Sequence, residues 1–335
     1  MSELLTAKGL VAHYRKLDGG WVRAVDGITL SLREGEVLGI AGESGCGKST
    51  LASVLSLTAH EPLRVRSGSL TIDGHVLDMA DLGSVPADLR GTLVSLLPQG
   101  AMNSLNPTQR VGDFAFDVLS SHLAEITREE ALTRLRTRLE QLGLPPRVIG
   151  AYPHQLSGGM KQRVVAVIST LLNPRVLIAD EPTSALDVSS QRALLALLDR
   201  LIRDKIIGSI VFVTHELPVL RNIAQRVMVM YAGQLAEVGP TERLIFEPSH
   251  PYTKALMNAT IVIETANRRE RIPDFEGSPP DLASPPPGCR FAPRCPMVHA
   301  QCTQEVPPEV TTEAGHQAAC WWVADQLRAK DTVAK

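Results

Sequence analysis

The sequence predicts an α/β protein whose core is a mainly parallel sheet with helices on its faces. Residues 42–50 read GESGCGKST and fit the phosphate-binding pattern G-x-x-x-x-G-K-[ST]. A buried strand is predicted over 37–41, directly before this loop, and a helix over 51–57, directly after it. Farther along the chain, apolar strands continue to alternate with helical segments, as in a parallel sheet with covered faces.

The loop carries the groups that bind a polyphosphate. Its glycines allow a tight turn that points successive backbone N–H groups inward. Lys48 adds a positive charge near the β- and γ-phosphates, and the Ser49 hydroxyl can ligate Mg²⁺. The alternative is a chance glycine-rich turn. The order strand, loop, helix argues against it, because the N-terminus of the following helix also attracts phosphate. The predicted nucleotide-binding residues of the loop are Gly42, Ser44, Gly45, Cys46, Gly47, Lys48, Ser49 and Thr50.

Composition excludes several classes of protein. The chain has 335 residues, 44% of them hydrophobic, and a formal net charge of −2, which gives no electrostatic reason to expect nucleic-acid binding. No apolar run reaches the roughly 18 residues needed to cross a bilayer. Residues 1–5 do not read as a secretory signal. We therefore expect a cytoplasmic protein whose membrane role, if it has one, comes through a partner.

The part of the chain before the loop alternates between polar and apolar residues in short pieces, 9–14, 21–31 and 37–40, which predicts an antiparallel set of strands. Tyr14 is the aromatic residue best placed there to stack on an adenine ring; an ordinary half-buried strand tyrosine is the alternative. After further strands at 70–72 and 93–97, leucines at three- and four-residue steps predict helix within 111–142. We expect a helical subdomain, about 100–172, inserted between two halves of the core.

The second half of the core begins with a strand at 176–179. A helix is predicted from Ser189 to about Ile206, and a strand follows at 210–213. Strands at 227–231 and 234–238 complete the nucleotide-binding domain, which we place at 1–240.

Polar side chains follow several of these strands, where phosphoryl-transfer chemistry needs them. Asp180 is placed to hold Mg²⁺, and Glu181 is placed to polarise the attacking water. His215 could donate a hydrogen bond near the γ-phosphate, and Gln99 could touch the metal or the water. A buried structural acidic pair and a structural histidine are the alternatives. Together with Lys48, these residues form the predicted catalytic set.

A second candidate anion site lies at 156–163, which read LSGGMKQR. Ser157 and the two glycines after it begin a helix and offer N–H groups and a hydroxyl to an anion. One phosphate loop already serves one γ-phosphate. A second anion site is therefore useful if it closes on a nucleotide held by another copy.

In this order, the motifs resemble those of the ATP-binding subunits of ABC transporters over about residues 4–240. The resemblance implies a head-to-tail dimer in which Ser157 and Gly159 of one subunit complete the ATP site of the other, with Glu181 as the catalytic base. It implies Mg²⁺ ligands at Ser49, Gln99 and Asp180. The signature motif corresponds to Leu156, Ser157, Gly158, Gly159, Met160 and Gln162, and the D-loop to Ser184, Leu186 and Asp187.

Two segments, 104–107 (SLNP) and 247–256 (EPSHPYTKAL), are similar to the dipeptide, oligopeptide and nickel importer branch. That branch implies uptake through two membrane permease subunits, an external substrate-binding protein and a second, different ATPase subunit. It also implies a place at the cytoplasmic face of the plasma (inner) membrane. Gly100-Ala101 departs from the branch, which usually has an acidic or amide residue and then proline; the departure concerns coupling to the membrane subunits and removes no catalytic group.

We expect ATP-driven uptake of peptides. An oligosaccharide or nickel importer is the alternative, because the membrane subunits and the binding protein select the cargo. A soluble ABC ATPase is a more distant alternative, because such proteins typically have two ATPase cores or a long coiled-coil insertion.

The end of the chain is predicted to differ from the core. A connecting helical segment is expected over 241–277, then a proline-rich linker and a cysteine-containing extension over 278–335. Its cysteines are Cys289, Cys295, Cys302 and Cys320, separated by 5, 6 and 17 residues. Zinc sites usually have closer cysteine pairs, and four thiolates suit an iron–sulfur cluster better, although His299 and His316 keep Zn²⁺ open. Unlinked core cysteines are the third interpretation. The importer resemblance favours a 4Fe–4S cluster with a structural or regulatory role.

Overall fold

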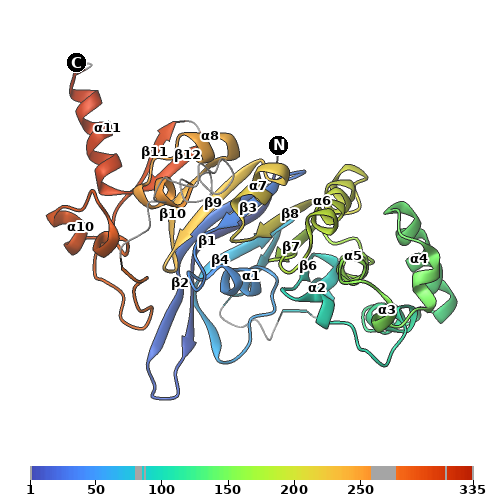
Figure 1. Ribbon diagram of the computed structural model, residues 1–335. Coiled ribbons are helices and arrows are strands. Elements are labelled where there is room, and N and C mark those ends of the chain that lie inside the picture. Colours follow the sequence, from blue (N-terminus) through green and yellow to red (C-terminus); the bar gives the residue numbers. More distant parts are fainter. Residues whose placement is uncertain (1, 80–84, 87, 258–276, 314, 334–335) are drawn as a thin grey trace.

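The computed structural model describes residues 2–79, 85–86, 88–257, 277–313 and 315–333, and in this part of the chain two sheets form (Figure 1). The smaller sheet is antiparallel and has four strands in the order β2-β1-β4-β5. Its strands are β1 (Glu3–Arg15), β2 (Trp21–Arg33), β4 (Leu63–Ile72) and β5 (His75–Leu77). The antiparallel strand set expected from the N-terminal alternation is therefore present.

The larger sheet has eight strands in the order β11-β12-β10-β9-β3-β8-β7-β6. Parallel pairing joins its strands from β9 to β6, and their carboxyl ends consequently meet at one edge. The parallel strands are β3 (Val37–Ala41), β6 (Val94–Leu97), β7 (Val176–Asp180), β8 (Ser209–Val213) and β9 (Arg226–Tyr231). Most of their residues are buried, as expected for a sheet covered on both faces.

Strand β3 shows how the core divides into two layers. Successive side chains of a strand point to opposite faces. Leu38 and Ile40 pack with the antiparallel sheet and with α1 (Lys48–Leu55), whereas Val37 and Ala41 pack with the cluster that contains the helices of the other face. The strand before the phosphate loop is thus fixed from both sides.

The remaining helices lie along and beyond the large sheet. The helical run expected within 111–142 is divided into α3 (Val111–Ser120) and α4 (Arg128–Gln141), because a Thr127–Glu130 capping box begins a new helix. The other helices of the core are α2 (Leu89–Thr92), α5 (Gly158–Ile168), α6 (Val188–Arg203), α7 (Leu217–Ile223) and α8 (Thr241–Phe246). In the described residues no helix is both long and apolar enough to cross a membrane.

Beyond α8 a helix covers 251–257, and the rest of the connecting segment, 258–276, lies outside the described residues. Residues 278–288 contain no helix or strand, and the backbone N–H of Arg23 donates to Leu282 O at 2.9 Å, so this linker lies against β2. The extension then forms α10 (Ala300–Gln304), β11 (Glu309–Glu313), β12 (His316–Ala319) and α11 (Trp321–Val333). Figure 1 shows α10 and α11 at the opposite end of the molecule from α3 and α4.

The extension joins the core sheet, which the sequence analysis does not predict. Strand β12 pairs antiparallel with β10 (Gln234–Pro240). The fully buried carboxylate of Glu237 lies 2.6 Å from His316 Nε2 and also accepts hydrogen bonds from the backbone N–H groups of Ser249 and His250. Strand β12 reads HQAA and lacks the apolar–polar alternation that would identify a strand from the sequence.

Candidate active site

The phosphate loop connects β3 to α1 and is shaped by close backbone approaches. A Cβ atom on Gly42 would lie 2.3 Å from Met230 O, and one on Gly47 would lie 1.9 Å from Ala24 O. Only glycine fits at such distances, and both residues also have positive φ angles, 147° and 102°. Lys48 Nζ donates to Gly42 O at 2.8 Å and to Glu43 O at 2.9 Å, which holds its charge inside the loop.

Ser49 and Asp180 bring two oxygen ligands together beside the loop. Ser49 Oγ donates to Asp180 Oδ1 at 3.1 Å, so the loop and the end of β7 are in contact. Burial raises the pKa of Asp180, and the adjacent charge of Glu181 also acts to raise it. A hydroxyl and a carboxylate are the oxygen ligands that Mg²⁺ takes in phosphate sites, and a bound cation would favour the ionised form of this carboxyl group.

Glu181 follows β7 and lies between side chains that follow β6 and β8, the two strands on either side of β7. Gln99 Nε2 donates to Glu181 Oε2 at 3.0 Å, and His215 Nδ1 lies 3.1 Å from Glu181 Oε1. The backbone of Glu181 has φ of 43°, an uncommon left-handed conformation for a residue other than glycine. The structure therefore brings the predicted residues of β6, β7 and β8 together around one carboxylate. Gln99, expected to touch the metal or the water, contacts this carboxylate in the structure.

Tyr14 lies beside the same loop. Its hydroxyl is 3.2 Å from Thr50 Oγ1, and its half-buried ring packs against the core that contains α1. The aromatic ring proposed for adenine stacking is thus next to the phosphate-binding residues.

The signature segment has an exposed part and a buried part. Ser157 caps α5 by accepting a hydrogen bond from Met160 N at 3.3 Å, and Ser157 and Gly158 are exposed. Leu156 and Met160 are half-buried, while Gly159 is buried and approaches Ser190 so closely that a Cβ would lie 2.4 Å from its hydroxyl. An anion could reach the exposed helix N-terminus from another molecule.

Gln162 is part of the signature motif but, unlike Ser157 and Gly158, it is not exposed. Its side chain is buried, and Nε2 donates to Pro182 O at 2.7 Å, one residue after Glu181. In the structure this amide joins α5 to the end of β7 within one chain.

The D-loop continues directly from Glu181. Ser184 Oγ donates to Glu181 O at 2.9 Å, and Leu186 packs half-buried against the core. Asp187 begins α6 and accepts hydrogen bonds from the side chains and backbone N–H groups of Ser189 and Ser190. These bonds, that of the Ser189 hydroxyl first, lower the pKa of Asp187 to about 2.

The sequence analysis misses two residues that contact the phosphate loop. Arg294 donates to both carboxylate oxygens of Glu43, at 2.9 and 3.2 Å, and Tyr252 Oη accepts from the backbone N–H of Glu43 at 2.9 Å. The available signal is Glu43 itself, because a carboxylate in an anion-binding loop needs a nearby positive charge.

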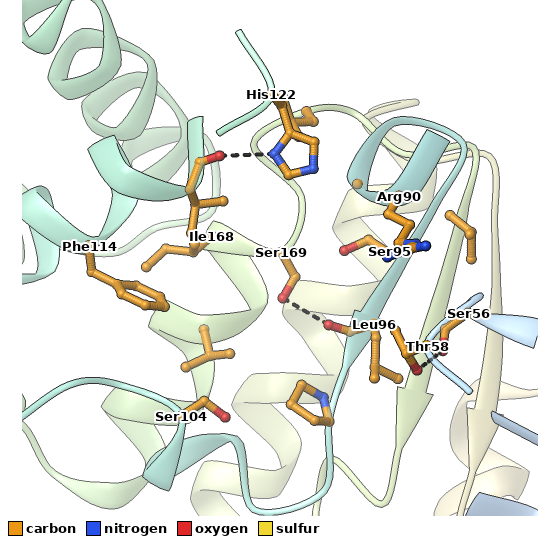
Figure 2. A pocket seen from close by; sticks show the side chains of 16 residues that line it. Ser56, Thr58, Arg90, Ser95, Leu96, Ser104, Phe114, His122, Ile168 and Ser169 are labelled. Atoms are coloured by element: carbon orange, nitrogen blue, oxygen red, sulfur yellow. Dashed lines mark hydrogen bonds between the residues drawn. The ribbon is translucent and has the colours of Figure 1, made fainter. Parts of the chain in front are cut away.

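An apolar cavity of about 300 Å³ lies between β6 and the helical insertion. Figure 2 shows Phe114 and Ile168 on one side of it and Leu96 of β6 on the other, with Ser169 Oγ donating to Leu96 O at 3.3 Å. Pro98 and Ser104 also line it, so the cavity borders the segment that contains Gly100-Ala101.

The four cysteines of the extension lie close to one another. Cys302 and Cys320 are buried and the other two are half-buried. Burial raises the pKa of Cys289 and of Cys295 to about 11, and the nearby thiols of Cys302 and Cys320 also act to raise it. Across the described ranges, however, no three histidine, cysteine or carboxylate side chains are arranged to hold a metal ion. The expected metal site, with 4Fe–4S or Zn²⁺, is therefore not supported by this arrangement of side chains.

The fold and the site define a P-loop nucleotide-binding protein, and the exposed start of α5 is a candidate second anion site. A family model described as ABC transporter matches residues 25–184, and one described as Oligopeptide/dipeptide transporter, C-terminal region, matches residues 236–302.

Similar proteins extend the match over nearly the whole chain. The chain is 40% identical to the di/tripeptide transport ATP-binding protein DppF of Pseudomonas aeruginosa, over 96% of this chain and 98% of that one. It is 37% identical to the dipeptide transport ATP-binding protein DppD of Bacillus subtilis, over 96% and 95%. A dimeric structure of the ATP-binding cassette MJ0796 bound to ADP and Pi is similar with a TM-score of 0.60 and 25% identity, over 71% of this chain and 98% of that chain.

The chain therefore belongs to the family of ABC transporter ATP-binding proteins, which couple ATP hydrolysis to transport. The resemblance inferred from the order of the motifs is confirmed.

Replacing Gly47 by alanine should abolish high-affinity ATP binding, because the new Cβ would lie 1.9 Å from Ala24 O in a backbone conformation that favours glycine. We expect ATP affinity to fall at least about tenfold, measured by titration with a fluorescent nucleotide. Gly150→Ala is the matched control, since a Cβ added there would meet no other part of the protein within 4 Å. Unchanged affinity in Gly47→Ala would contradict this account of the loop.

Proposed function

We propose that this chain is the ATP-hydrolysing subunit of an importer that takes up peptides. The observation that carries the proposal is the match of residues 236–302 to the C-terminal region of oligopeptide/dipeptide transporters. The relatives named for di/tripeptide and dipeptide transport, which are similar over almost the full length, support it. Oligosaccharide or nickel uptake would use the same ATPase chemistry.

The positions of the side chains support the catalytic roles that we propose. Lys48 binds the β- and γ-phosphates, and Ser49 and Asp180 would hold Mg²⁺, which neutralises phosphate charge when bound. Glu181 orients and polarises the attacking water. Gln99 and His215 hold its carboxylate from two sides, at 3.0 and 3.1 Å, so its position is fixed before nucleotide arrives.

ATP binding closes two such subunits head to tail. Ser157, exposed at the start of α5, and Gly159 in the same turn complete the site of the nucleotide held by the other subunit. The similarity to a dimeric ATP-binding cassette supports this arrangement. The partner is a second, different ATPase subunit.

The closed dimer drives two membrane permease subunits, which receive peptide from an external binding protein. The chain works at the cytoplasmic face of the plasma (inner) membrane and is attached there through the permeases.

Replacing Glu181 by glutamine should preserve ATP binding and stop turnover, trapping the closed dimer. A general base contributes at least about 100-fold to the rate, so we expect a loss of that size in phosphate release. Glu242→Gln, an exposed carboxylate on α8, is the control. Turnover near that of the wild type would show that Glu181 is not the base.

The transported substrate is tested by the ATPase rate of the purified complex with its membrane subunits and its binding protein. The binding protein is loaded in turn with a panel of peptides, oligosaccharides or nickel chelates. We expect stimulation by peptides. Stimulation only by sugars or nickel chelates would show that the transported substrate is not a peptide. The absence of any copurifying permease would favour a soluble ATPase.

We also propose that Cys289, Cys295, Cys302 and Cys320 hold a 4Fe–4S cluster with a structural or regulatory role. Their gathering in one small unit supports this.

Anaerobically purified protein should contain about four iron atoms and matching acid-labile sulfide per chain. Cys302→Ser should lose both, whereas Cys46→Ser, outside the extension, should retain them. Zinc in place of iron would support the Zn²⁺ alternative, in which His299 and His316 are candidate ligands. The absence of both metals would identify these residues as core cysteines.

A further inference from the structure

The carboxylate of Glu43 places a negative charge in a loop that binds a triphosphate. It follows Gly42 directly, and its negative charge would oppose the phosphates unless a cation neutralises it. Arg294 provides that cation through hydrogen bonds to both carboxylate oxygens, at 2.9 and 3.2 Å. The Arg294 side chain is only 6% exposed, so water screens this ion pair little.

The backbone of Glu43 is held separately. Its N–H donates to Tyr252 Oη at 2.9 Å, and Tyr252 is fully buried. Tyr252 packs against Tyr231 and Phe291, with ring centroids 4.6 and 5.4 Å away. Arg294 also donates to Tyr231 Oη at 3.1 Å, so the two contacts to Glu43 are joined through β9.

A second arginine of the extension acts on the other side of the loop. Arg290 donates to Asp26 of β2 and to Ala232 O. The next residue, Gly233, donates its N–H to Cys46 O of the phosphate loop at 2.8 Å. The loop is therefore supported near both Glu43 and Cys46 by residues that depend on the extension.

Both arginines lie next to cysteines of the extension. Arg290 follows Cys289 and Arg294 precedes Cys295, and the segment between them is closed by backbone hydrogen bonds, Ala292 N to Cys289 O at 3.0 Å and Cys295 N to Ala292 O at 3.3 Å. The pairing of Cys289 N with Cys302 O at 2.8 Å continues this compact unit. The positions of the guanidinium groups are thus set by the fold around the cysteines.

We propose that Arg294 and Tyr252 are positioning residues for ATP binding, which hold the phosphate loop through Glu43 and make ATP affinity depend on the folded C-terminal extension. The role deepens the proposed function by making the nucleotide site depend on contacts from the extension. It requires ATP binding by this chain and does not depend on which substrate is transported.

The test is a rescue experiment on the full-length chain, with ATP affinity measured by calorimetric titration. Arg294→Gln leaves Glu43 unneutralised, and we expect ATP to bind about tenfold more weakly. Adding Glu43→Gln removes the opposing charge and should restore most of the affinity. Arg203→Gln, which breaks the exposed Asp199 ion pair on α6, is the matched control and should bind ATP as the wild type does.

In steady-state ATPase assays, Arg294→Gln should raise KM for ATP with little change in kcat, because the catalytic side chains are untouched. Wild-type affinity in Arg294→Gln would overturn the proposal. So would a double variant that binds ATP as weakly as Arg294→Gln, since the loss of affinity would then not come from the unneutralised charge of Glu43.

Tyr252→Phe removes one oxygen atom and preserves the aromatic packing, so it tests the second contact even if Arg294→Gln does not fold. We expect faster hydrogen exchange in the peptide containing Glu43 and weaker ATP binding. Unchanged exchange and affinity would overturn the role of Tyr252. Peptide-stimulated transport is not read in any of these assays, so failure of the importer proposal and failure of this one give different results.

Discussion

Parallel pairing of the central strands is the constraint on which the site depends. Strands β3, β8, β7 and β6 are neighbours in the large sheet, and each ends at the same edge. The phosphate loop, His215, Glu181 and Gln99 follow these ends in turn. Their side chains can therefore meet at 3.0 to 3.1 Å although they come from distant parts of the chain. The geometry of the sheet places the carboxylate of Glu181, which we propose as the catalytic base, and contacts with Gln99 and His215 hold it there.

Local motifs made much of this arrangement predictable. The loop at 42–50, the strand ending in Asp180 and the helix beginning after Ser157 each contain their own structural signal within a few residues, namely glycines, an apolar run or a cap. Their order along the chain was enough to identify the family, and the similar proteins confirm it. The two sheets also follow from short-range alternation and from the regular succession of strands and helices.

Contacts between distant segments were not predictable in the same way. Arg294 and Glu43 are 251 positions apart, and although Glu43 indicates a need for a nearby cation, no pattern in the sequence identifies Arg294 as that cation. The pairing of β12 with β10 is similar, because the residues of β12 lack the alternation that would identify a strand. The four cysteines of the extension are a further example. Their spacing in the sequence indicated that they share one structural unit, but the distances between their thiols depend on how the whole extension packs.

The position of β3 in the sheet has a consequence for synthesis of the chain. Strand β3 ends at residue 41, yet its partners β8 and β9 begin at residues 209 and 226. On the ribosome, the apolar strand that precedes the phosphate loop is complete long before either partner has been made. Such long-range pairing is slow to form and leaves apolar surface exposed meanwhile. The nascent chain thus has a long interval in which a chaperone could bind this strand, and the nucleotide pocket is among the last parts of the protein to be completed.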